Sequence, residues 1–345
     1  SRGLGDVYKR QHLHNEKWGD WVIIGYRKVF MAIILSLVFC TSIIGICVYI
    51  SGNGVYSENG VESKRKIGAT YMTMNNSYFK IINEEIRYVV EENGDTLITR
   101  DPALSLDKQI EEIYDFIDLK VDAIFINPVD WVGIRNALID AQKAGIIIIA
   151  IDTDIYDDNL TACTVVSDNY KAGVLCAKDL MNKRNSANII LLEHKSAKSA
   201  IDRINGFEDT IRNNKNFKVV ARRDCDGQLE TAMPVVENIL LKQKDVDTIM
   251  ALNDPSALGG IMALEEKNIK GINVYGIDGS PDGKKMVKED KMCATVSQSP
   301  RKIGRISGES LYNIFQGKEV DKKIVVPVEL ITKENIDEFR LDTWQ

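Results

Sequence analysis

Carboxylates, amides and aromatic rings recur in this sequence just after the short apolar runs that read as β-strands. The segment 72–79, MTMNNSYF, places two adjacent amides and two adjacent rings directly after one such run. Similar polar residues follow later runs: Asn127, Asp152, Ser167, Asp168, Asn253, Asp254 and Asp278. Taken singly, each residue also fits a helix cap or a turn, because Asn, Asp and Ser favour those positions. Taken together they predict one polar cleft, since ligands of open α/β sheets bind at the carboxyl ends of the strands.

The predicted cleft has the composition of a site for a neutral polyol. Carboxylates and amides accept hydrogen bonds from hydroxyl groups, and amides also donate to them. The ring faces of Tyr78 and Phe79 would cover the C–H side of a pyranose or furanose. Acidic groups dominate the set, which disfavours an anionic ligand.

The sequence contains no recognisable catalytic motif. It has no G-x-G-x-x-G after a strand, no Walker loop, no G-x-S-x-G elbow and no H-E-x-x-H. Of the three histidines only His194 lies in the predicted folded body, and no partner for acid–base chemistry can be placed beside it. His194 reads as a polar residue at a strand end, a position compatible with facing the cleft. We therefore expect a binding protein without catalytic residues, and not an enzyme.

Metal and redox chemistry are not indicated either. The acidic run at 152–158 lacks the glycine and the terminal glutamate of a calcium loop. Two of the six cysteines fall in an apolar run near the start of the chain. The other four have no zinc or haem spacing and are expected to be buried: Cys163, Cys176, Cys225 and Cys293. A disulfide between two of them is allowed outside the cell, but the sequence does not identify the pair. We expect no metal and no cofactor.

A scaffold that positions the polar residues can be read from the rest of the sequence. Short β-rich runs alternate with helix-length amphipathic segments, a pattern typical of βαβ units in a parallel sheet. The predicted strands are KIGATYM, DTLITR, AIFIN, IIIIAID, CTVVSD, NIILLEH, KVVARRD, TIMALN and NVYGID. So many units exceed one ordinary sheet, and a second series begins near residues 166–169. We therefore predict an α/β protein with two doubly wound parallel-sheet lobes.

The last part of the chain is expected to cross back between the lobes. A further strand, a helix that begins near Arg301 and the segment KIVVPVEL follow the second series. We assign residues 64–167 and 299–327 to an N-terminal lobe. Residues 168–298 and 328–345 are assigned to a C-terminal lobe, joined to the first by a hinge.

A membrane segment is predicted before the lobes. Residues 29–50, VFMAIILSLVFCTSIIGICVYI, carry no charge and have about the 20-residue length that spans a hydrocarbon core. Basic residues precede this run and only acidic charge follows it closely, so the lobes are expected at the extracytoplasmic face of a bacterial membrane. We expect a transmembrane anchor, and an uncleaved signal sequence is the alternative interpretation. Neither Cys40 nor Cys47 follows the small residue expected at a lipidation site.

The segments around this run carry little further information. Residues 1–11, SRGLGDVYKRQ, resemble a translated sequencing adapter and are given no weight. Residues 12–28 are expected to be a short cytoplasmic segment, and residues 51–63 a stalk. The 345-residue chain has a formal charge of −6, which provides no broad basic surface for a nucleic-acid backbone. No nucleic-acid partner is expected.

Successive motifs at the predicted strand ends resemble those of the periplasmic sugar-binding proteins of the ribose and galactose type. They run in order from about residue 64 to about residue 334: MNNSYF, INPVD, IDTD, VVSDN, DRINGF, ALNDPSALG, GIDGSPDG and ATVSQSP. The resemblance implies a type I periplasmic-binding-protein fold, in which two lobes close on a sugar by hinge motion. It also implies the substrate-binding component of an ABC sugar transporter.

Carried over residue by residue, the resemblance implies a ligand site that both lobes share. The first lobe would supply Asn76, Tyr78, Phe79, Asn127, Asp152 and Ser167. The second lobe would supply Arg203, Cys225, Asn253, Asp278 and Gln298. In this set Arg203 suits the role of a forked donor to ring and hydroxyl oxygens.

The sequence departs from the ribose pattern in three places. Thr153 stands where ribose binders carry an arginine, and Cys225 occupies an aromatic position. Ile277 precedes Asp278 where phenylalanine is usual. Two rings and a cation are lost, so a different pentose, a hexose or a furanose-like signal such as autoinducer-2 becomes admissible.

The expected function is the binding of a monosaccharide, a pentose or hexose, by a monomer that delivers it to an ABC permease. A receptor that reports sugar or autoinducer-2 to a membrane histidine kinase is the alternative, and the sequence does not separate the two. Repressors of the lactose-repressor type share this ligand fold, but they need a DNA-binding helix-turn-helix where the apolar run stands here. An enzyme on the same α/β architecture would need a nucleophile or an acid–base pair, and only ordinary carboxylates are visible.

Overall fold

The computed structural model describes Met31 and residues 64–344, and the chain divides into two compact units, Ser1–Ser63 and Lys64–Gln345. Apart from Met31, the predicted segments 1–11, 12–28, 29–50 and 51–63 lie outside the described residues. Within the described part of the chain, no helix has both the length and the apolar composition needed to cross a bilayer. The unit Lys64–Gln345 contains both sheets and the buried apolar clusters that pack on them, so it is expected to fold without the residues before it.

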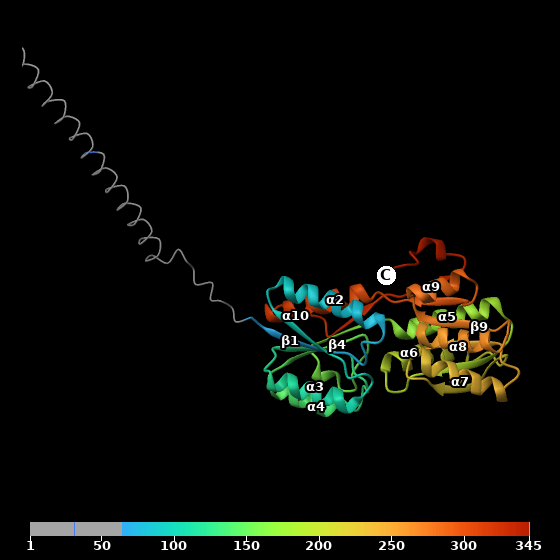
Figure 1. Cartoon of the computed structure of the whole chain (residues 1–345), viewed down its shortest axis with the longest axis horizontal. Helices are drawn as coiled ribbons and strands as arrows, with labels where there is room; N and C mark the ends of the chain where they lie inside the picture. Colours follow the sequence, from blue (N-terminus) through green and yellow to red (C-terminus); the bar gives the residue numbers. More distant parts are fainter. Residues whose placement is uncertain (1–30, 32–63, 345) are drawn as a thin grey trace, which may run out of the picture. The chain divides into compact units, whose positions relative to one another are not determined.

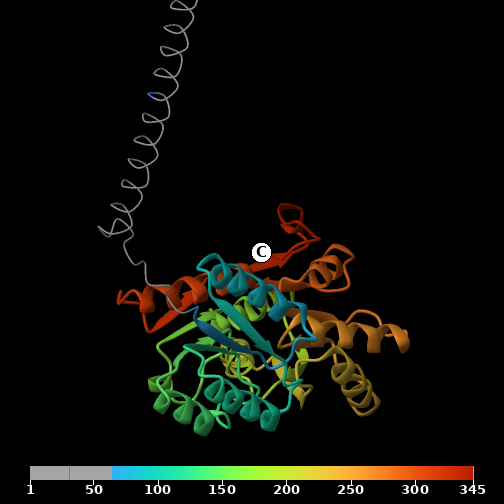
Figure 2. The same cartoon turned by 60° about the vertical axis from the view of Figure 1, so that its left-hand side comes forward.

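Six parallel strands form the first sheet. Their spatial order is β11 (Lys323–Val326), β5 (Cys163–Ser167), β4 (Ile147–Ile151), β3 (Ala123–Ile126), β1 (Lys66–Thr70) and β2 (Thr96–Arg100). Helices cover both faces, α2 (Ser77–Glu92) and α10 (Pro300–Phe315) on one side, α3 (Leu106–Asp118) and α4 (Arg135–Lys143) on the other (Figures 1 and 2).

The sequence of β3 shows why both faces of this sheet are covered. Side chains of successive strand residues point to opposite faces. Phe125 accordingly joins the apolar cluster that contains residues of α2 and α10, whereas Ile124 and Ile126 join the cluster under α3 and α4. All of these side chains are fully buried. Continuous apolar runs such as AIFI are therefore read correctly as strands with two buried faces.

The second sheet also has six strands, with one antiparallel edge. Their order is β12 (Glu329–Thr332), β10 (Ala294–Ser297), β9 (Asn273–Asp278), β8 (Thr248–Ala251), β6 (Ala187–Glu193) and β7 (Phe217–Asp224). The surrounding helices are α5 (Asn169–Lys183), α6 (Lys198–Ile211), α7 (Leu229–Lys242), α8 (Asp254–Glu266) and α9 (Pro281–Lys288). The predicted pair of α/β lobes with parallel sheets is confirmed, with β12 as the antiparallel addition.

The chain passes between the two lobes at three places. It leaves the first sheet after β5 and enters α5, which packs in the second lobe. It returns after β10 to form α10, which packs on α2. Finally β11 completes the first sheet and β12, only two residues later, completes the second.

The close approach of α5 and α6 depends on two glycines. A Cβ atom added at Gly173 would lie 1.8 Å from the carbonyl oxygen of Arg203, and one at Gly206 would lie 2.0 Å from that of Tyr170. No side chain fits at either position, so the two helix backbones lie in direct contact. This contact sets the position of Arg203, which lies on α6.

We predict that Gly173→Ala lowers the free energy of unfolding of Lys64–Gln345 by about 1–3 kcal/mol, because overpacking forces the two backbones apart. Urea unfolding followed by far-ultraviolet circular dichroism measures this change. The matched control is Gly260→Ala on α8, where the nearest atom to an added Cβ lies 3.5 Å away. That variant is expected to be neutral or stabilised by up to about 1 kcal/mol, since alanine is the better helix former. Equal behaviour of the two variants would contradict the close-packing explanation.

Candidate ligand-binding cleft

A polar cavity lies where strand ends of the two lobes meet. It occupies about 410 Å³, counted out to its opening. The first lobe contributes Met72, Asn76, Tyr78, Phe79 and Asp152 to the lining. The second lobe and the crossing after β10 contribute His194, Ala197, Ser199, Ala200, Arg203, Asp226, Gly227, Gln228, Leu252, Asn253, Asp278 and Gln298.

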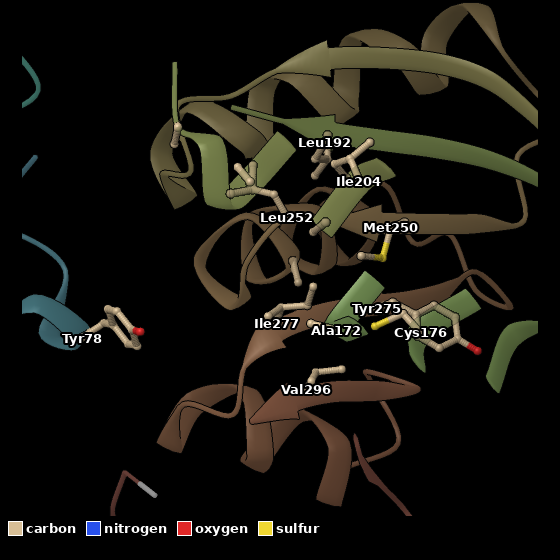
Figure 3. Close-up of a cluster of buried hydrophobic side chains, with 14 of the residues drawn as sticks. Tyr78, Ala172, Cys176, Leu192, Ile204, Met250, Leu252, Tyr275, Ile277 and Val296 are labelled. Carbon is tan, nitrogen blue, oxygen red and sulfur yellow. The ribbon is translucent and has the colours of Figure 1, made fainter. Parts of the chain in front are cut away.

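The structure brings eight of the eleven predicted site residues into this lining: Asn76, Tyr78, Phe79, Asp152, Arg203, Asn253, Asp278 and Gln298. Figure 3 shows Tyr78 projecting from α2 while Leu252, Ile277 and Val296 belong to the apolar core of the second lobe. The convergence follows from topology, because the carboxyl ends of parallel strands lie along one edge of each sheet.

Asn76 and Asn253 are helix caps as well as lining residues. The side-chain oxygen of Asn76 accepts a hydrogen bond from the backbone N–H of Tyr78 at 2.9 Å, and that of Asn253 accepts from Ser256 at 3.0 Å. Asn253 also donates through Nδ2 to the carbonyl oxygen of Gly227 at 2.9 Å. The sequence allowed two interpretations of these residues, helix cap or cleft residue. Both are correct for Asn76 and Asn253.

Three predicted site residues lie behind the lining. Asn127 is fully buried and donates to Oδ2 of Asp152 at 3.3 Å, while its own Oδ1 accepts from the backbone N–H of Met72. Ser167 ends β5, where its hydroxyl is buried without a hydrogen-bond partner. Cys225 is fully buried and outside the lining, and its thiol donates to the hydroxyl of Ser256 at 3.3 Å. Its neighbours Asp226 and Gly227 lie at the cavity in its place.

Some lining residues were not predicted from the sequence. His194, whose position after a strand is compatible with the cleft, does line it. The larger unpredicted side chains are Met72, Gln228 and Leu252, with Ala197, Ser199, Ala200, Asp226 and Gly227 completing the set. Most of them lie on loops directly after β6, β7 and β8, so the rule that strand ends converge could have identified them if it had been applied to every strand.

A chain of hydrogen bonds joins the two lobes across the cavity. The hydroxyl of Tyr78 donates to Oε1 of Gln298 at 3.1 Å, and Nε2 of Gln298 donates to Oδ1 of Asp278 at 2.8 Å. At the rim, the backbone N–H of Ser199 donates to Oγ1 of Thr153 at 2.9 Å. Thr153, which replaces an arginine of the ribose pattern, therefore holds the lobes together and does not line the cavity.

Arg203 contributes a guanidinium cation to the cavity lining. Its side chain is almost fully buried, and its Nη1 lies 3.7 Å from Oδ1 of Asp278. Nη1 also donates to the carbonyl oxygen of Leu252 at 3.0 Å, and Nε donates to Oδ1 of Asn169 at 2.8 Å. These contacts fix the plane of the guanidinium group, so that it presents a rigid donor to the cavity.

Buried carboxylates outnumber this cation. Burial raises the pKa of Asp152, while the charge of Arg203 opposes the shift. Burial and the nearby charge of Asp254 raise the pKa of Asp278 well above the usual range. The pKa of Asp254 is itself raised by burial. Oδ1 of Asp152 is buried without a hydrogen-bond partner, so it is available to accept from a hydroxyl group.

The backbone is strained at the same carboxylates. Asp152 has φ of 66°, Asp226 has 52° and Asp278 has 152°, values that non-glycine residues rarely adopt. Such conformations persist where the surrounding structure enforces them, and they concentrate at functional sites. All three aspartates line the cavity, so the unfavourable backbone angles occur where the carboxylates are needed.

The arrangement suits binding of a hydroxyl-rich ring. Carboxylate acceptors, amide groups and one guanidinium surround the space, and two aromatic rings from α2 form part of its apolar wall. Within residues 64–344 the structure contains no group of three or more His, Cys, Asp or Glu side chains arranged to hold a metal ion. The four described cysteines are free thiols.

Known sugar-binding proteins are similar to this chain in sequence. The periplasmic binding protein domain family matches residues 67–319. The ribose import binding protein of Bacillus subtilis is 31% identical over 280 residues, which cover 81% of this chain and 90% of that protein. The galactofuranose-binding protein of Escherichia coli is also 31% identical, over 225 residues that cover 62% of this chain and 71% of that protein.

Solved structures of similar proteins share the two-lobed fold. An ABC transporter solute binding protein from Bacillus halodurans with bound myo-inositol has a TM-score of 0.75 and 25% identity, covering 81% of this chain and 98% of that one. A periplasmic solute binding protein from Actinobacillus succinogenes with bound D-allose has a TM-score of 0.73 and 26% identity, covering 80% of this chain and all of that one.

We predict that Asp278→Asn makes the ligand-free protein more stable at about pH 7, and that this advantage shrinks at about pH 5. A carboxyl whose pKa is raised on folding binds more protons in the folded state. Its contribution to stability therefore grows as the pH falls from neutral toward the ordinary aspartate value. The asparagine variant cannot titrate at this position, yet it keeps an acceptor for Gln298.

Urea unfolding of both proteins at the two pH values measures the difference. Because burial lowers the pKa of His194, this group loses stability as the pH falls, but it does so in both proteins and cancels. Asp158→Asn, at an exposed position, is the control. A variant that is less stable at both pH values would mean that the contact with Arg203 outweighs the burial of the charge.

Proposed function

The chain belongs to the family of periplasmic binding protein domains, and from this premise we propose that it binds one monosaccharide-sized polyol outside the cytoplasm and delivers it to an ABC-type importer. The resemblance to sugar-binding proteins of the ribose and galactose type is confirmed by these relatives. This family consists of binding proteins, and we assign no catalytic step to the chain. Its relatives place it on the extracytoplasmic side.

The observation that carries the proposal is the buried, unpartnered oxygen of Asp152 in a cavity lined by both lobes. In our proposal this oxygen accepts a ligand hydroxyl, and Asp278 accepts a second one. Arg203 donates to a ring or hydroxyl oxygen, while Tyr78 and Phe79 cover the C–H face of the ring.

Hinge closure is the proposed response to binding. A ligand shifts an equilibrium only by as much as it prefers one state, so a ligand that favours closure must touch both lobes. We propose residues 64–167 with 299–327, and residues 168–298 with 328–345, as the two moving units. The direct hydrogen bond between Ser199 and Thr153 supports this, because it joins the lobes beside the cavity.

The identity of the ligand is narrowed by the departures from the ribose pattern. Thr153, Cys225 and Ile277 stand where the ribose pattern has its cation and two of its rings, so those groups are missing here. All three residues also lie outside the cavity lining. We therefore propose a hexose, a pentose other than ribose, or a cyclitol as the preferred ligand, in line with the allose and myo-inositol of the similar structures. Autoinducer-2 remains an admissible furanose-like ligand.

A sensing role is the second candidate. A retained membrane anchor is compatible with both a permease and a membrane histidine kinase as the partner of the closed form.

We further propose that the protein is monomeric. We also propose that residues 29–50 anchor it, because this stretch is uncharged and long enough to span a bilayer.

We predict that Lys64–Gln345 binds at least one sugar with micromolar or tighter affinity in titration calorimetry. The panel contains D-ribose, L-arabinose, D-galactose, D-allose, myo-inositol and autoinducer-2. Asp152→Ala and Asn253→Ala are expected to weaken binding about 100-fold or more, because each removes a hydrogen-bond partner from a desolvated site. Asp158→Ala, an exposed aspartate of the same lobe, should bind like the wild type. A folded sample that binds no member of the panel would refute the sugar assignment.

We also predict that the full chain, expressed in a bacterium, remains with the membrane after washing in alkaline carbonate. A variant lacking residues 29–50 should appear in the soluble fraction, since the remaining chain has no comparable uncharged run. Release of the full chain by the same wash would exclude an anchor.

A further inference from the structure

The segment after β12 reaches back to the ligand cleft. Residues 339–344 follow the short helical turn Ile336–Glu338, which packs on α9 of the second lobe. At the end of this segment the ring of Trp344 lies on that of Tyr78, with 5.5 Å between centroids and 63° between planes. Tyr78 belongs to α2 of the first lobe and lines the cavity. This ring contact therefore joins the lobes at a point separate from the three chain crossings.

A buried lysine fixes the segment just before Trp344. The ammonium group of Lys284, on α9, donates to the carbonyl oxygens of Arg340 and Thr343, each at 2.5 Å. Lys284 has no exposed surface, and burial lowers its pKa while the charge of Asp254 opposes the shift. A buried ammonium group is destabilising unless hydrogen bonds compensate it. Here the compensation comes from the carbonyl oxygens of Arg340 and Thr343, so the lysine holds the backbone directly before Trp344.

Tyr78 is held from three sides. Phe79 packs edge-on against it, with centroids 5.4 Å apart and planes at 82°. Its hydroxyl donates to Gln298 at 3.1 Å, and Trp344 covers a further part of the ring. In the described lining the second lobe contributes no phenyl, phenol or indole ring, only small aliphatic side chains and Leu252 beside its polar groups. The orientation of the Tyr78 ring therefore matters more to the apolar wall than it would in a cavity with rings on both sides.

We propose that Trp344 is a positioning residue of the ligand cleft. It holds the ring of Tyr78 against the cavity, and Lys284 holds the segment that carries Trp344. The inference rests on the proposed sugar-binding function, which it deepens by adding a residue that the cavity lining does not contain. In this arrangement the second lobe orients a ligand-facing ring of the first lobe.

Tryptophan fluorescence allows a test that does not need the ligand. Residues 64–345 contain two tryptophans, Trp131 and Trp344, so Trp131→Phe leaves Trp344 as the only one. In this background we expect Tyr78→Ala and Lys284→Gln each to increase quenching of Trp344 by acrylamide at least about twofold, since both remove a contact that shields the indole. Circular dichroism confirms that the variants are folded. Unchanged quenching in both folded variants would overturn the proposal.

Affinity supplies the second readout, with the tightest binder of the sugar panel as the probe. Trp344→Ala is expected to weaken binding about tenfold, the effect of losing one favourable aromatic pair. Trp344→Phe should restore most of the affinity, because a phenyl ring still packs on Tyr78. Leu341→Ala, at an exposed position of the same segment, is the control and should leave affinity unchanged.

The outcomes separate the two proposals. If the wild type binds no sugar, the proposed function fails, and the quenching experiment alone decides whether Trp344 is held on Tyr78. If the wild type binds sugar and Trp344→Ala binds equally well, the positioning role is refuted while the sugar assignment stands. If the alanine and phenylalanine variants lose affinity equally, packing on Tyr78 is not the cause.

Discussion

The structure depends on keeping one guanidinium among several carboxylates away from water. Arg203 lies beside Asp278, and Asp152 and Asp254 are buried nearby. Charges in such a place are strongly destabilising unless they are paired and hydrogen-bonded. The protein meets this condition with short polar contacts, including those from Thr295 and Ser280 to Asp254 and from Gln298 to Asp278. Oδ1 of Asp152 is left without a hydrogen-bond partner and is therefore free to accept one from a ligand.

This charge arrangement constrains the fold around it. Arg203 reaches the cleft only because α5 and α6 pack with their backbones in contact at Gly173 and Gly206. The carboxylates face the cavity only with unusual backbone angles at Asp152 and Asp278. Both features reduce conformational freedom, and both place charged groups where a polyol can bridge them. The close contact of α5 and α6 and the backbone angles of the aspartates thus determine both how tightly the lobe packs and which charged groups line the cleft.

The fold and much of the cleft could be predicted from the sequence because both follow from periodicity and strand ends. Asn76, Asp152 and Asn253 come directly after buried runs, so topology alone brings them together. Cys225 was predicted as a lining residue by its place in a motif, but the backbone turns there and its neighbours line the cavity instead. His194 and Gln228 follow strands as well: the position of His194 is compatible with the cleft from the sequence, whereas Gln228 gives no such signal. Trp344 and Lys284 could not be predicted, because their contacts with Tyr78 and with residues 339–344 join parts of the chain that no local pattern relates.

The position of β11 and β12 has a consequence for how the chain acquires its structure during synthesis. The first sheet is complete only when β11 pairs with β5, and α2 gains its packing partner α10 only after β10. Both elements are made after residues 168–298 of the second lobe. Closing such a long chain loop is slow, because entropy is lost before the contacts form. A ribosome must therefore make residues 168–298 of the second lobe before the first lobe, which it began earlier, can complete its sheet.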